Sequence, residues 1–187
     1  RVKDYFQRFV TRFPSVFDLA DADESVVLRH WEGLGYYRRA RQLHATAKLI
    51  VSEHQGKFPQ EADALRQLPG IGRYTAGAIA SISFDLPEPI LEANSRRVLA
   101  RLVQYDRPLL GNKSDEPLWD VAAALVPRNG GAGEFNQALM DLGSIVCTPV
   151  SPCCEKCPLA KQCEAYQLGI VDRIPNVRGR KLSLIHI

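Results

Sequence analysis

The chain has 187 residues, 45% of them apolar and 24% charged, and 24 basic against 21 acidic side chains give a net charge of +3. A chain of this size can bury a substantial core, in one domain or two small lobes. No apolar run is long enough to cross a membrane and no signal peptide is recognisable, which excludes a membrane-spanning function. The only methionine is Met140, so we expect a fragment of a longer protein.

Apolar residues recur at helical spacing through nearly the whole chain, and no segment alternates as a strand would, which predicts an all-α fold. Pro87 and Pro89 interrupt this pattern and give the predicted boundary between a first lobe, 1–88, and a second lobe, 89–172. The tail, 173–187, has no evident place in the fold and is interpreted as non-native. The expected helices cover 4–12, a segment capped by Asp23, 36–53, 61–68, 73–83, 94–104, 114–125 and 134–146.

A string from Leu68 to Gly77 joins two of the short predicted helices through a turn that contains Gly70 and Gly72. Glycine has no Cβ, so the backbone of this turn can approach a phosphate closely. The helix that begins at Arg73 presents free N–H groups and the positive end of its dipole to such an anion. The string therefore predicts a helix-hairpin-helix element that positions DNA without reading its sequence. The alternative is an ordinary connection between two helices.

Four cysteines near the C-terminus follow a compact spacing, Cys147-x6-Cys154-x2-Cys157-x5-Cys163. In a chain without a secretory signal, such clustering indicates a metal site rather than a disulfide framework. Four thiolates in so short a segment can hold either an iron–sulfur cubane or a tetrahedral zinc ion. Cys153 lies outside the spacing and is expected to be a free thiol.

Together these motifs resemble the MutY adenine glycosylases, within the endonuclease III-like helix-hairpin-helix glycosylases, from Tyr5 to about Gln167. The resemblance implies a six-helix barrel lobe and an iron–sulfur cluster lobe, with DNA bound in the cleft between them. It implies an enzyme that removes adenine opposite 8-oxoguanine or guanine in double-stranded DNA. Such an enzyme is expected to be a monomer in the cytoplasm, associated with the nucleoid in a bacterium. The matching strings are Trp31 to Tyr37, Leu68 to Ala80, Val98 to Arg101, Phe135 to Gly143 and the cysteine loop.

The same resemblance implies roles for individual residues. Its cysteine spacing implies a [4Fe–4S] cluster in preference to zinc. Tyr36, with Gly35 before it, matches an aromatic residue that is wedged into the base stack beside the flipped nucleotide, which recovers part of the flipping energy. Gln137 matches a residue that hydrogen-bonds adenine, and an amide suits a base edge because it both donates and accepts. The alternatives are a core tyrosine and a structural amide.

Tyr74 distinguishes the subclasses of these enzymes. Bifunctional relatives carry a lysine at this position, and its amine attacks the sugar. A tyrosine cannot form a Schiff base, so the resemblance implies hydrolysis by water, with the Tyr74 hydroxyl near the reacting sugar. The alternative is a tyrosine that only lines the barrel.

The string Glu92-Ala93-Asn94 stands where the family has Asp-Gly-Asn, whose aspartate stabilises the cation-like sugar. Glu92 keeps the charge but extends it by one methylene, and a misplacement of about 1 Å can lower a rate roughly 10²-fold. Asn94 is expected to cap the helix and to orient this carboxylate. The alternative is that Glu92 is only an acidic residue at a helix N-terminus.

The family's general acid, a glutamate that protonates adenine, lies upstream of the segment that matches Tyr5. We therefore expect the 187-residue chain alone to be inactive or nearly so, and its parent to be active. Two other functions remain open on the sequence: an endonuclease III-like glycosylase for oxidised pyrimidines, against which Tyr74 argues, and a non-catalytic DNA-binding relative.

Overall fold

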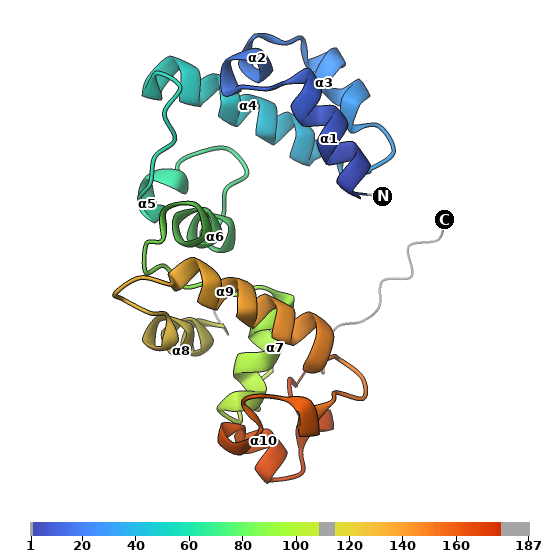
Figure 1. Cartoon of the computed structure of the whole chain (residues 1–187), viewed down its shortest axis with the longest axis vertical. Helices are drawn as coiled ribbons and strands as arrows, with labels where there is room; N and C mark the ends of the chain where they lie inside the picture. The colour runs from blue at the N-terminus through green and yellow to red at the C-terminus, as the bar shows by residue number, and fades with distance from the viewer. Residues whose placement is uncertain (1, 109–114, 177–187) are drawn as a thin grey trace. The chain divides into compact units, whose positions relative to one another are not determined.

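The structure is a computed structural model that describes residues 2–108 and 115–176. These residues form helices and turns without a β-strand, so the all-α prediction is confirmed (Figure 1). None of the described helices is long and apolar enough to span a membrane. The predicted helix start at Ser114 and the tail beyond residue 176 lie outside the described residues.

The chain divides into two compact units, Arg1–Ala76 and Gly77–Ile187. The first contains α1 (Val2–Arg12), α2 (Val16–Asp21), α3 (Glu24–Trp31), α4 (Tyr37–His54), α5 (Ala62–Leu65) and the start of α6 (Arg73–Phe84). Its core gathers apolar side chains from three of these helices and the turn after α1, namely Phe13, Leu19, Val27 and Ala47.

Two details of the first unit differ from the prediction. The short helix α2 was not expected, and it is stabilised by a capping box in which Ser15 Oγ accepts from Asp18 N at 3.2 Å and Asp18 Oδ2 accepts from Ser15 N at 3.0 Å. Six residues are too few to show a helical period, so only this cap could have revealed α2. Asp23 precedes α3, but its side chain makes no capping hydrogen bond, so that prediction was wrong.

The second unit is built around α7 (Ala93–Leu102), which contacts α8 (Glu116–Leu125), α9 (Ala132–Asp141), η1 (Leu142–Val146) and α10 (Glu164–Gln167) (Figure 1). The helix predicted over 134–146 does not continue as one α-helix, because η1 is a π-helical turn. Gly143 in this turn packs so closely on α7 that a Cβ there would lie 2.6 Å from Asn94 Cβ. The cysteine loop adds the 3-10 turns η2 (Cys154–Lys156), η3 (Ala160–Gln162) and η4 (Val171–Arg173).

The C-terminal half of α6 belongs to the second unit through a buried amide. Asn136 on α9 donates from Nδ2 to Ser81 Oγ at 2.8 Å and to the Glu88 carbonyl at 2.9 Å. These bonds explain why the boundary along the chain falls within α6, before the prolines at 87 and 89. The lobe limits at 88 and 172 stay a prediction. The start of the tail does have a place in the fold, since Ile174 is buried and its carbonyl accepts from Arg101 Nε at 2.8 Å, so that prediction was wrong for residues 173–176.

Candidate functional site

The hairpin in the first unit is held in place by α4. Thr46 Oγ1 donates to the Pro69 carbonyl at 2.8 Å, and a Cβ on Gly70, where φ is +78°, would lie 2.8 Å from the Gln42 side chain. Only glycine suits this conformation and this close contact. Gly72 faces open space, with nothing within 4 Å of the place where its Cβ would be. Since α6 begins directly after it, at Arg73, the predicted helix-hairpin-helix element is formed.

Two side chains of interest open α6. Arg73 is exposed, and Tyr74 beside it is partly buried. Both lie in the first turn of the helix, at the end where the helix dipole favours an anion.

Tyr36 is both exposed and strained. Its φ of +50° places a non-glycine residue in the left-handed region, and 81% of it is exposed. Trp31 Nε1 fixes the preceding turn by donating to the Gly35 carbonyl at 2.9 Å. A left-handed conformation costs about 1–2 kcal/mol for an L-residue, and strain of this kind concentrates at functional sites. The alternative of a core tyrosine is therefore wrong.

Glu92 is the N-cap of α7. Its Oε1 accepts from the backbone N–H groups of Asn94 and Ser95, each at 2.8 Å, while Ser95 Oγ accepts from the Glu92 N–H at 2.8 Å. This reciprocal arrangement is a capping box, and it fixes the carboxylate at the positive end of the helix dipole. Asn94 does not cap the helix, so that prediction was wrong, because Glu92 already satisfies these donors.

Sequence reasoning missed Arg97, which connects this cap to the cysteine loop. Its Nη2 donates to Asn94 Oδ1 at 2.9 Å and to the Gly143 carbonyl at 2.6 Å, and its Nε donates to the Cys147 carbonyl at 2.6 Å. Burial lowers the pKa of the Arg97 guanidinium below its ordinary value. The only signal in the sequence was a pair of arginines, 97 and 101, one helical turn apart beside apolar residues.

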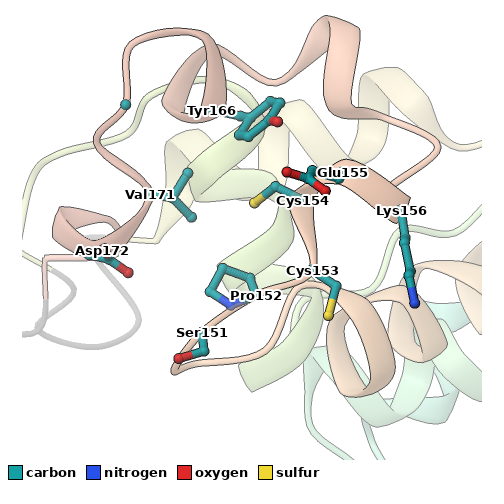
Figure 2. A pocket seen from close by; sticks show the side chains of 10 residues that line it. Ser151, Pro152, Cys153, Cys154, Glu155, Lys156, Tyr166, Val171 and Asp172 are labelled. Carbon is teal, nitrogen blue, oxygen red and sulfur yellow. The ribbon is translucent and has the colours of Figure 1, made fainter.

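The four spaced cysteines line one small, largely enclosed cavity in the second unit, together with Arg101 and several apolar side chains. Burial raises the pKa of the Cys154 and Cys163 thiols. Cys153 is exposed, its side chain points away from that of Cys154 (Figure 2), and it does not line this cavity. It lines an open pocket of the same loop, which Cys154 also borders.

The described residues hold no group of three or more His, Cys, Asp or Glu side chains arranged around a single metal ion. A zinc ion would draw all four sulfurs to about 2.3 Å from one point. A cubane instead binds each cysteine through a different iron, so its sulfurs stand farther apart. The four thiols that line this enclosed cavity are a donor set that both a [4Fe–4S] cluster and a structural zinc ion use.

A further pocket of the second unit lies between the end of α6 and α9. Gln137 lines it with an exposed side chain that donates from Nε2 to Asp141 Oδ1 at 3.2 Å. Its neighbour Asn136 is 1% exposed and makes the internal bonds described above. The structural amide of this string is therefore Asn136, which leaves Gln137 available to a ligand.

Asp85 lines the same pocket and fixes the turn before α9. Its carboxylate accepts from the Gly131 N–H at 2.9 Å and from the Gly133 N–H at 3.2 Å. The bond from Gly131 has the largest effect, and together these bonds lower the pKa of Asp85 below its ordinary value of 3.8. The charged carboxylate therefore stabilises the folded state at a pH above the ordinary pKa. This stabilisation is lost as the pH falls through the lowered pKa of the folded state.

We expect Asp85→Asn to melt below wild type at neutral pH, because the amide offers one acceptor where the carboxylate offers two. The difference should begin to shrink as the pH falls below about 4, where this carboxyl becomes protonated in the unfolded chain, and should continue to shrink as the pH falls through the lowered pKa of the folded state. Thermal unfolding followed by circular dichroism across this range checks it. A difference that stays constant with pH would assign the effect to packing rather than charge.

The family described as HhH-GPD superfamily base excision DNA repair protein matches residues 1–121. The chain belongs to the HhH-GPD superfamily. The hairpin that α4 supports is the element from which this superfamily takes its name, and the sequence prediction of a helix-hairpin-helix fold is confirmed.

Two similar proteins are adenine DNA glycosylases. The chain is 42% identical to an adenine DNA glycosylase of Buchnera aphidicola from Schizaphis graminum, over 96% of the chain and 52% of that protein. It is 44% identical to a mouse adenine DNA glycosylase, over 96% of the chain and 35% of that protein. The chain thus spans about half of the first relative and a third of the second. The resemblance to adenine glycosylases inferred from the motifs is confirmed.

Solved structures support the same fold. A thermostable thymine-DNA glycosylase superimposes with a TM-score of 0.79 at 30% identity, covering 89% of this chain and 76% of that one. An endonuclease III–DNA complex gives a TM-score of 0.74 at 22% identity, covering 90% and 77%. The second likeness concerns the fold alone.

Proposed function

We propose that the protein containing this chain is a monofunctional adenine DNA glycosylase, which hydrolyses the N-glycosidic bond of adenine opposite 8-oxoguanine or guanine. The observation that carries the proposal is the Glu92 carboxylate, fixed at a helix N-terminus in a chain of this superfamily that has tyrosine, not lysine, at position 74. Without an amine at that position, the attacking nucleophile is water.

In this proposal Glu92 stabilises the positive charge that develops on the sugar as adenine leaves. Both bonds from the α7 N-terminus go to Oε1, so the carboxylate is oriented before the substrate arrives. Preorganised charge of this kind is commonly the largest single contribution to enzymatic rate. Tyr74 hydrogen-bonds near the reacting sugar, while Gly70, Gly72 and Arg73 hold a DNA phosphate at the start of α6.

The cavity lined by Cys147, Cys154, Cys157 and Cys163 would hold a [4Fe–4S] cluster. Its four thiols converge in an enclosed site, as the chemistry of such a cluster requires. When bound, the cluster supplies a redox-active charge and ties together the two ends of the loop that follows η1. It takes no part in the hydrolysis, for which the side chains above are responsible.

Tyr36 is proposed to stack on the DNA bases beside the everted adenine. We expect Tyr36→Ala to weaken binding to mispaired duplex DNA roughly 10- to 100-fold, since one base–aromatic contact contributes about 1–3 kcal/mol. Tyr36→Asn should weaken binding equally but stabilise the fold by about 1 kcal/mol, because asparagine tolerates the left-handed conformation. Fluorescence anisotropy and thermal unfolding measure the two effects. An alanine variant that bound as tightly as wild type would contradict the stacking role.

Gln137 is proposed to hydrogen-bond the adenine edge, and Asn136 beside it provides a matched control. Gln137→Ala should lower single-turnover adenine release by about 10-fold, the effect of losing one or two hydrogen bonds, with stability unchanged within about 0.5 kcal/mol. Asn136→Ala should instead destabilise the second unit by about 1–3 kcal/mol, because Ser81 loses a buried partner. Equal loss of stability in both variants would make Gln137 a structural residue.

The function is tested with the whole protein on duplexes that carry A opposite 8-oxoguanine, A opposite guanine, or an oxidised pyrimidine. Adenine release that leaves an alkali-sensitive abasic site, with no adduct after borohydride, is the expected result. A borohydride-trapped adduct on the oxidised pyrimidine would identify an endonuclease III-like enzyme. Tight DNA binding without release of any base would identify a non-catalytic relative.

A further inference from the structure

Arg101 on α7 is buried against the four-cysteine cavity, with 2% of it exposed. Its Nη1 donates to Cys147 Sγ at 3.2 Å and to the Thr148 carbonyl at 2.8 Å. Its Nε donates to the Ile174 carbonyl at 2.8 Å. One guanidinium thus contacts a cysteine sulfur at the start of the loop and the backbone at its end.

A second cysteine contacts the same residue through its backbone. Cys163 Sγ lies 3.4 Å from the Arg101 carbonyl oxygen. Arg101 therefore touches two of the four spaced cysteines, one with its side chain and the other with its main chain. Arg97, one turn earlier, reaches the Cys147 carbonyl but not a sulfur.

The charge of Arg101 has no carboxylate to balance it. A guanidinium stays ionised in proteins, and burying an unpaired charge is costly. Among residues 2–108 and 115–176 no carboxylate forms an ion pair with Arg101, whereas its neighbour Arg96 pairs with Asp115 at 3.4 Å. The cysteine sulfurs beside the guanidinium become negatively charged as thiolates when they bind a metal group, and they would then balance its charge.

We propose that Arg101 is the internal counter-cation of the four-cysteine site and raises the reduction potential of the cluster held there. The inference rests on the cluster assigned under the proposed function. The potential of an iron–sulfur cluster depends on the net charge around it and on hydrogen bonds to its sulfurs, and Arg101 supplies both. A nearby positive charge stabilises the more negative, reduced state. Arg101 is a positioning residue, because it touches a ligand and not the metal.

The test compares Arg101→Met and Arg101→Lys with a matched control, Arg96→Met, which removes an arginine of the same helix that pairs with a carboxylate. Iron and acid-labile sulfide are measured per chain, and the potential is measured by voltammetry on the whole protein. Arg101→Met should shift the potential to more negative values, Arg101→Lys should shift it less, and the control should match wild type.

The outcomes separate charge from architecture. A full cluster in Arg101→Lys but none in Arg101→Met would support the inference, because charge is then required already for assembly. An Arg101→Met protein with a full cluster and the wild-type potential would overturn it. Loss of the cluster from both Arg101 variants, while the control keeps its cluster, would also overturn the inference, because the role of Arg101 would then be purely architectural. A wild-type protein without iron and sulfide would overturn the proposed cluster, and this inference with it.

Discussion

Replacing Glu92 by glutamine should lower the rate of adenine release by roughly 10²- to 10³-fold, the effect of removing one preorganised electrostatic group from an active site. Glutamine keeps an oxygen that can accept both bonds from the start of α7. The change therefore removes the charge and leaves the cap, so stability should fall by only about 0.3–1 kcal/mol. Single-turnover release from a duplex with A opposite 8-oxoguanine measures the first effect, and thermal unfolding measures the second.

Two further variants separate catalysis from capping. Glu92→Asp keeps the charge and should retain most of the activity that glutamine loses. Ser95→Ala breaks the other half of the capping box, which should destabilise the second unit by about 0.5–2 kcal/mol with little effect on the rate. If Glu92→Gln released adenine as fast as wild type, Glu92 would be a capping residue without a chemical role.

Replacing Cys157 by serine should abolish the iron–sulfur cluster and destabilise the second unit by about 4 kcal/mol or more, as expected when a structural metal site is lost. Such a loss is large beside the total stability of a domain, about 5–15 kcal/mol. We expect the loop to depend on the proposed cluster, because its own elements are only 3-10 turns and one short helix. Brown colour, iron and sulfide content, and thermal unfolding report the change.

The control for this experiment lies in the same loop. Cys153→Ser alters an exposed thiol outside the four-cysteine cavity, so it should retain the cluster and stay within about 0.5 kcal/mol of wild type. Equal iron content in Cys153→Ser and Cys157→Ser would contradict the ligand assignment. Zinc in place of iron and sulfide in the wild-type protein would contradict the cluster itself.

The sequence alone was sufficient for features encoded within a few residues of one another. Helical periodicity identified most of the helices, and the two-glycine turn identified the hairpin, because a local pattern determines a local conformation. The spacing of the cysteines singled out four residues that line one cavity, and Cys153 does not line it; their role as ligands stays a prediction. Tyrosine at position 74 is likewise visible without any structure, since its chemistry depends on residue type alone.

Tertiary structure decided which groups partner one another over long separations. Arg97 and Arg101 on α7 reach backbone and sulfur atoms about 50 to 70 residues farther along the chain, so no local pattern could identify their roles. The strained, exposed backbone of Tyr36 and the burial of Asn136 beside an exposed Gln137 also depend on packing around them. Tertiary structure also decided which residue caps α7, because only the folded backbone shows that Glu92, and not Asn94, accepts from the N–H groups at the start of this helix.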